Sequence, residues 1–168
     1  MKQLFLLFVV SFALFSCSGN KKAVEASAAT FELDQLLTVA DRNLDDTITV
    51  VGYVTHTCMH SGKKCFIVGE SQKVSLRVEA EGEIETFSAD LIGSKLAITG
   101  TLKENHLSEE YIDNLENAWK ELENEEGMAE TCSAELSNIS DMRQWMKDHD
   151  KDYYVMYYMD GLKYSVLD

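Results

Sequence analysis

Apolar residues occupy every second position in several stretches of the chain, and this period of two predicts β-strands. The clearest stretch is 74–80, where the intervening polar residues indicate a strand with one buried and one solvated face. Residues 48–58, 65–68 and 96–102 also have strand character. Gly52 interrupts the first of them, as a glycine does where a strand bends or bulges. The pattern predicts a three-strand meander, a connection and a fourth strand.

In the first predicted strand, a strict period of two assigns alternate residues to opposite faces. One face takes Ile48, Val50, Val54, His56 and Cys58, and the other takes Thr49, Tyr53, Thr55 and Thr57. We therefore expect His56 and Cys58 to share a face with the aliphatic residues of this strand.

Helical spacing of apolar residues appears on both sides of the strands. Residues 33–40 predict a short helix that starts near Asp34. A longer amphipathic helix is expected from Ser108 to about Glu126, and a further one from about Ile139 to Asp148. These helices flank the strands on the chain and are expected to flank them in space.

The last strand signal covers residues 152–167 and has Asp160-Gly161 near its middle. Asp-Gly between two strand-like runs is typical of a tight hairpin turn. Taken together, the elements predict a β-rich α+β fold: an OB-like small β-barrel with flanking helices and a C-terminal β-hairpin.

The N-terminus has the layout of an export signal. Lys2 precedes an apolar run from Leu4 to Phe15, which is shorter than the roughly 20 residues that span a bilayer. Leu14-Phe15-Ser16-Cys17 resembles the lipobox of bacterial lipoproteins, although Phe15 is bulkier than the residue usual at that position. The resemblance implies cleavage before Cys17 and acylation of Cys17, for example with palmitate. An ordinary cleaved signal followed by a chance cysteine is the alternative.

This resemblance also implies a location in the cell envelope and a division of the chain into three parts. Ser18 after the cysteine is similar to the context of lipoproteins that are sent on to the outer membrane. We expect a signal peptide over 1–16, the lipidated cysteine with a flexible tether over 17–30, and a single domain over 31–168.

Acidic residues outnumber basic ones by 29 to 15, which gives a formal net charge of −14. Such a chain is repelled by nucleic-acid phosphates and by anionic lipid headgroups. We therefore expect no nucleic-acid partner, and we expect the lipid alone to hold the protein at the membrane. A metal ion, a small ligand, a basic peptide or another envelope protein remains compatible with this charge.

Reactive side chains gather in one segment, His56-Thr57-Cys58-Met59-His60-Ser61-Gly62-Lys63-Lys64-Cys65. It holds two of the four histidines and two of the four cysteines of the chain. Together with residues 51–55 and Ser75–Ala80, this segment resembles the core of small lipoproteins of the Bacteroidota type that contain an OB-like domain. That resemblance implies a fold and an envelope location, and it implies no activity.

A metal site is one hypothesis for this segment. His56, Cys58, His60 and Cys65 form a donor set that zinc accepts, and copper(I) is equally compatible with it. Along an extended strand, His56 and His60 would stand about 13 Å apart. The strand must therefore end near Cys58, so that a turn at Gly62 can bring His60 back towards the two sulfur atoms.

A disulfide is the competing hypothesis, because the predicted hairpin places Cys58 and Cys65 opposite each other. Facing residues of an antiparallel pair lie about 4.5 Å apart between Cα atoms, which a disulfide accepts. The oxidising envelope favours a bridge, and Cys132 would then be left unpaired. A bridge and a metal site exclude each other, since both need the same two sulfur atoms.

Catalysis by a cysteine-histidine pair is the third hypothesis. His56 or His60 could lower the pKa of Cys58, and Lys63 and Lys64 would stabilise a thiolate. The chain has no C-x-x-C motif and no phosphate-binding glycine loop. We therefore expect a binding protein, or a structural or interaction lipoprotein with a Cys58–Cys65 clamp or switch, rather than an enzyme.

Overall fold

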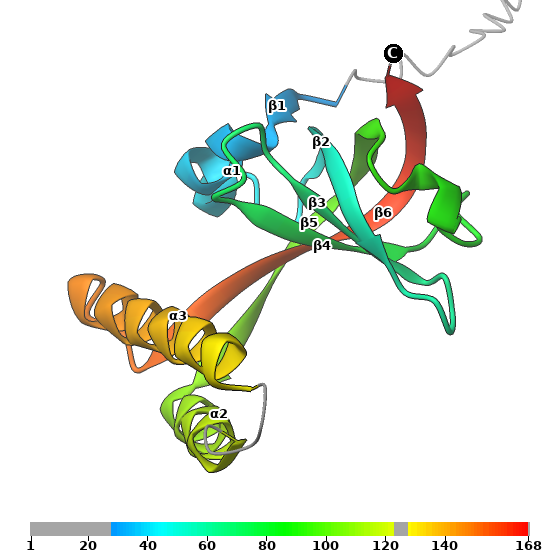
Figure 1. Ribbon diagram of the computed structural model, residues 1–168. Helices are drawn as coiled ribbons and strands as arrows, with labels where there is room; N and C mark the ends of the chain where they lie inside the picture. Colours follow the sequence, from blue (N-terminus) through cyan, green and yellow to red (C-terminus); the bar gives the residue numbers. More distant parts are fainter. Residues whose placement is uncertain (1–27, 123–127, 168) are drawn as a thin grey trace, which may run out of the picture.

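A computed structural model describes residues 28–122 and 128–167 of the chain. Its strands form one sheet in the order β1-β2-β3-β4-β6-β5, and a further pairing of β2 with β5 closes five of them into a barrel. The elements are β1 (Thr30–Glu32), α1 (Leu33–Val39), η1 (Ala40–Arg42), β2 (Thr47–Thr57), β3 (Lys64–Val68), β4 (Ser75–Ala80), η2 (Ala89–Leu91), β5 (Lys95–Ser108), α2 (Glu109–Leu122), α3 (Ala129–Asp148) and β6 (Tyr153–Leu167). The structure confirms a β-rich α+β fold with an OB-like barrel (Figure 1).

The barrel is a mixed sheet, and its extra strand is added at one edge. The β1–β2 and β4–β6 pairs are parallel, and the other pairs are antiparallel. The interior is filled by fully buried aliphatic side chains from all the barrel strands, and α1 contributes Leu33 and Leu36 to the same core. This cluster includes Ile48, Val50, Ile67, Leu76, Val78, Leu96, Ile98, Leu102 and Met159.

Strands β5 and β6 continue beyond the barrel as a two-stranded ribbon, and α2 and α3 connect their far ends (Figure 1). The two helices pack on one face of this ribbon and form a second hydrophobic cluster around Leu107, Ile112, Ile139 and Met146. The chain therefore has one core inside the barrel and another under the helices. Within the described ranges, no helix is long and apolar enough to cross a membrane.

The predicted C-terminal hairpin is wrong, because residues 153–167 form the single strand β6. This strand pairs with β5 along its whole length, and Gly161 also pairs with Ala80 of β4. A Cβ atom at Gly161 would lie 2.6 Å from Val78 Cγ1. The glycine therefore allows β6 to approach β4 closely and does not form a turn.

The proposed lipobox, Cys17 and most of the expected tether lie outside the described residues. The expected short helix and the helix from Ser108 are found, the latter as α2 up to Leu122, where the described range ends. Helix α3 begins at Ala129, about three turns before the expected start at Ile139.

Candidate ligand-binding face of the barrel

The hairpin between β2 and β3 contains a bulge that decides which side chains face outwards. Tyr53 pairs with Val68 and Val54 with Ile67, but His56 pairs with Phe66, so that Thr55 is an extra residue. Beyond the bulge the alternation is reversed: Thr57 is buried and His56 is exposed. The expectation that His56 shares a face with Ile48 and Val54 is therefore wrong.

Cys58 does not lie opposite Cys65, contrary to the sequence-based expectation. The bulge makes Thr57 the partner of Cys65, and the backbone N–H of Cys58 donates to the Lys64 carbonyl over 2.8 Å. Cys65 is fully buried in the barrel core, and Cys58, which follows the last residue of β2, is half-buried. Both are free thiols in this structure, as is the buried Cys132.

The pKa values of the two hairpin thiols are shifted in opposite directions. Burial raises the pKa of Cys65 to about 12, so this thiol is protonated under ordinary conditions. The hydroxyl of Ser61 donates a hydrogen bond of 3.3 Å to the Cys58 sulfur, and this bond is the main reason why the pKa of Cys58 is lowered. The turn that places Ser61 there is closed by a hydrogen bond from Gly62 N–H to the Cys58 carbonyl over 2.7 Å.

The structure does not gather the four proposed metal donors around one point. Cys65 points into the barrel, whereas His56 and His60 are exposed. Among the residues that the structure describes, no group of three His, Cys, Asp or Glu side chains could hold a metal ion.

A different set of residues shares the outer face with His56. His56 pairs with Phe66, Phe66 with Arg77, Arg77 with Tyr158, and Tyr158 with Lys103. Because directly paired residues project to the same side of a sheet, these five side chains form one line across five strands. We call it the outer row.

Two neighbouring pairs in the outer row contact each other. The rings of His56 and Phe66 have centroids 6.0 Å apart and are inclined by 45°. The guanidinium carbon of Arg77 lies 5.0 Å from the centre of the Tyr158 ring, which is a cation–π distance. Lys103 Nζ ends the row and is bound to a carboxylate oxygen of Asp45 at 2.7 Å.

Glu79 lies beside the outer row on β4 and contacts two of the cations. Its Oε1 is 3.2 Å from Arg77 Nε and 3.7 Å from Lys64 Nζ. Nε is buried, and neither this oxygen nor any other atom of the described residues forms a hydrogen bond with it. The cation therefore has an ionic partner but no hydrogen-bond acceptor at that atom.

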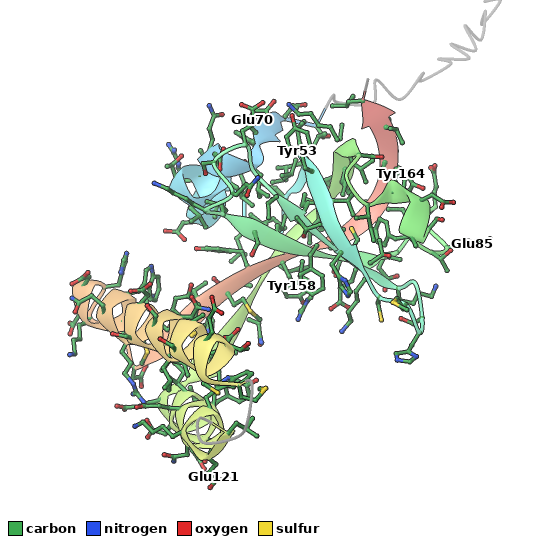
Figure 2. The ribbon with its side chains drawn as sticks, in the orientation of Figure 1. Tyr53, Glu70, Glu85, Glu121, Tyr158 and Tyr164 are labelled. Carbon is green, nitrogen blue, oxygen red and sulfur yellow. The ribbon has the colours of Figure 1, made fainter. Side chains whose placement is uncertain are left out.

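The outer row lies on the side of the sheet that carries the two long helices. In Figure 2, Tyr158 projects from the barrel towards this side. Tyr154 and Met156 follow the same face of β6 in steps of two, and both pack against the helical cluster. The helices therefore cover one end of the face on which the row lies and leave His56 and Phe66 exposed at the other end.

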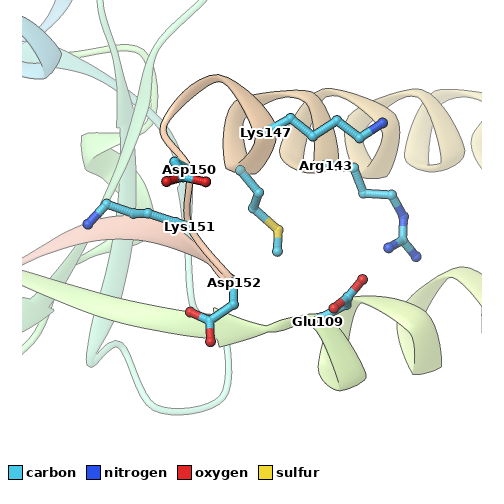
Figure 3. Close-up of a pocket in the computed structure, with 7 residues that line it drawn as sticks. Glu109, Arg143, Lys147, Asp150, Lys151 and Asp152 are labelled. Atoms are coloured by element: carbon cyan, nitrogen blue, oxygen red, sulfur yellow. The ribbon is translucent and has the colours of Figure 1, made fainter.

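A separate groove of about 610 Å³ lies between the end of α3 and the start of α2 (Figure 3). Arg143 lies above it and Glu109 lies below, and Met146 also lines it. Arg143 donates to Asp113 over 2.6 Å and to Glu116 over 2.7 Å, which raises the pKa of its guanidinium. This arginine joins the two helices, so a structural role accounts for it.

Reasoning from sequence missed Phe66 and Arg77 as members of a site. The period of two in 74–80 assigns Arg77 to the solvated face of its strand. The row depends in addition on the Thr55 bulge and on the parallel pairing of β4 with β6, and neither has a sequence signal of its own.

No family model matches this chain, and no curated protein matches it. A solved structure from Leishmania major Friedlin, assigned to an aspartyl-tRNA synthetase, is similar with a TM-score of 0.41 and 13% sequence identity. The similarity covers 87% of this chain and 22% of the other, so the chain spans about a fifth of that protein's length.

Proposed function

We propose that this protein is a lipid-anchored binding protein of the cell envelope, whose OB-like barrel holds a small ligand on the outer row. The observation that carries the proposal is the line of His56, Phe66, Arg77 and Tyr158 across adjacent strands. Aromatic rings and a guanidinium supply flat contact area and hydrogen-bond donors in one place, which is the usual composition of a ligand site.

The same line favours an organic ligand over a metal ion. The bulge at Thr55 puts His56 and Cys65 on opposite sides of the hairpin, so the proposed zinc or copper donors do not converge. His56 instead lies beside the ring of Phe66. An imidazole in that position can stack on a ligand or bind it through a hydrogen bond.

The anchor rests on the lipobox-like segment that ends at Cys17. Replacing Cys17 with Ser should abolish incorporation of radiolabelled palmitate and move the protein out of the membrane fraction of the producing cell. Cys132→Ser is the matched control, because Cys132 is buried in the helical part and should not be acylated. Equal labelling of Cys17→Ser and the unaltered protein would contradict the anchor.

Ligand binding on the outer row is tested by nuclear magnetic resonance of the full-length protein in nanodiscs. A library of small aromatic, charged and sugar compounds is added, and the perturbed backbone amides are mapped. We expect hits to perturb residues of β3, β4 and β6 around Arg77 and to weaken in Tyr158→Ala. A library without hits, or hits that all map elsewhere, would contradict this function.

A second candidate is a structural or interaction lipoprotein, and the end of β6 favours it. Residues 163–167 are exposed, and they pair with β5 on one side. Val166 is 54% exposed although it pairs with the fully buried Leu96. A photo-crosslinking side chain at Val166 that captures a defined protein in the envelope, when one at Thr47 does not, would favour this candidate.

A further inference from the structure

Arg77 has hydrogen-bonding capacity that the described residues leave unused. Its Nε is the one buried side-chain nitrogen or oxygen without a hydrogen-bond partner in the described ranges. Arg143, by contrast, donates to two carboxylates. Buried polar groups are nearly always paired, so an unpaired one calls for a physical explanation.

The position of Arg77 is fixed before any ligand arrives. Its guanidinium lies over the ring of Tyr158 at 5.0 Å and beside Glu79 at 3.2 Å. The Arg77 side chain as a whole is 27% exposed. A cation held in place in this way loses little conformational entropy when it binds an acceptor.

The nearby charges favour an oxyanion as that acceptor. Lys64 and Arg77 share the single carboxylate of Glu79, at 3.7 Å and 3.2 Å. The hydrogen bond with Asp45 is the main reason why the pKa of Lys103 is raised, and the charge of Asp160, the strand partner of Glu79, adds to it. Two cations with one carboxylate between them can accept a second oxyanion, and a guanidinium matches the two oxygens of a carboxylate.

An exposed ring lies next to this cation. Phe66 faces Arg77 directly across the β3–β4 pair and is 36% exposed, and His56 follows on β2. Adjacent strands are about 4.8 Å apart. A ligand that carries its carboxylate on a flat ring, or within a few bonds of one, can therefore contact Arg77 and Phe66 at the same time.

We infer that the outer row binds a carboxylate attached to a flat apolar group, with the carboxylate on Arg77 and the flat group on Phe66. This inference rests on the proposed binding function and names the ligand class of the same site. The chain's net charge of −14 repels anions at long range, so Arg77 and Lys64 must supply the attraction at short range. Two sources carry this chemistry: a free aromatic acid, and a peptide that ends in an aromatic residue.

The test is calorimetry of the full-length protein in neutral nanodiscs with four probes. These are 2-naphthoate, its uncharged analogue 2-naphthamide, acetate, and the peptide acetyl-Gly-Phe with a free carboxylate. We expect 2-naphthoate to bind at least tenfold more tightly than 2-naphthamide or acetate. Comparison with acetyl-Gly-Phe distinguishes the two sources, and tighter binding of either one supports the inference.

Variants assign the contact to Arg77. Arg77→Lys keeps the charge but loses the planar donor pair, and it should weaken 2-naphthoate binding roughly tenfold or more. Arg42→Lys is the matched control, because Arg42 lies on η1 and its side chain reaches the Thr38 carbonyl instead. Glu79→Gln removes the internal competitor and should strengthen binding severalfold, so the test does not depend on the stability of one variant.

The outcomes separate the inference from the function on which it rests. Equal affinity for 2-naphthoate and 2-naphthamide, together with perturbed backbone amide signals on the outer row, would overturn the inference that the ligand is a carboxylate. The proposed binding function would still stand. Weaker binding of 2-naphthoate to Glu79→Gln also overturns the inference. If neither these probes nor the small-compound library perturb the outer row, the binding function fails, and the inference fails with it.

Discussion

Thr57 faces Cys65 across the β2–β3 hairpin, and both side chains point into the barrel core. The extra residue at Thr55 produces this pairing, so that Thr57 and not Cys58 lies opposite Cys65. One bulge therefore separates the two thiols of the hairpin and exposes His56 to the ligand face.

The two hairpin thiols should react at very different rates. Cys58 carries a pKa lowered by the hydrogen bond from Ser61, so its thiolate is available at a lower pH than that of free cysteine. Cys65 is fully buried. We expect a maleimide to label Cys58 in the native protein and to label Cys65 only after unfolding, as measured by peptide mass spectrometry.

Ser61→Ala removes the hydrogen bond and should shift the labelling of Cys58 to higher pH. Recovery of a Cys58–Cys65 disulfide from the native protein, made without added oxidant, would contradict the structural separation of the two thiols.

Stability should fall in alkaline solution because of Cys65. Its pKa is about 12 in the folded state and about 8.5 in an unfolded chain, so the unfolded state loses its proton first. The stabilising contribution is fully present below pH 8.5 and is lost as the pH rises towards 12. Urea unfolding between pH 7 and 10 should show a smaller decline in Cys65→Ala than in the unaltered protein, and an equal decline would contradict it.

Gly161 should not tolerate a methyl group. A Cβ atom there would lie 2.6 Å from Val78 Cγ1 and 3.3 Å from the Glu79 carbonyl oxygen. Gly161→Ala should lower the free energy of unfolding by about 1–3 kcal/mol, the usual cost of overpacking. Ser165→Ala on the exposed end of the same strand should change it by less than about 0.5 kcal/mol. Urea denaturation measures both.

Replacing Asp150 with glycine should stabilise the folded protein. It ends α3 with a φ of +51°, where its N–H donates to the Lys147 carbonyl and the next N–H, from Lys151, donates to the Met146 carbonyl. This is the helix-ending motif that favours glycine. Asp150→Gly should raise the free energy of unfolding by about 0.5–1 kcal/mol, whereas Asp148→Gly, at the last residue of the helix, should lower it. A loss of stability in Asp150→Gly would show that its side chain is needed at the helix end.

The sequence predicted the barrel because several of its segments have a period of two with one buried face, as residues 74–80 illustrate. It could not predict the Thr55 bulge, since a strand with one extra residue has the same composition as a regular strand. Asp160-Gly161 predicted a turn for a valid local reason, but the close packing of Gly161 on Val78 is a long-range requirement.

The start of α3 was missed for a related reason. Residues 129–138 offer few apolar positions, and Cys132 and Leu136 carry the packing there. The candidate site depends on register between distant strands, so the segment with the most reactive residues indicated only one end of it, His56.

The continuous β5–β6 ribbon makes both hydrophobic cores depend on one pairing register between β5 and β6. From Gly100–Gly161 to Ser108–Tyr153 the pairing runs without a shift, with Leu102 and Met159 in the barrel core. Leu107 and Tyr154 belong to the helical cluster on the opposite face. A slip by one residue would turn both sets of side chains out of their cores at once. The correct register of β5 and β6 is therefore stabilised by both hydrophobic clusters, and a ribbon in the wrong register would lose both of them together.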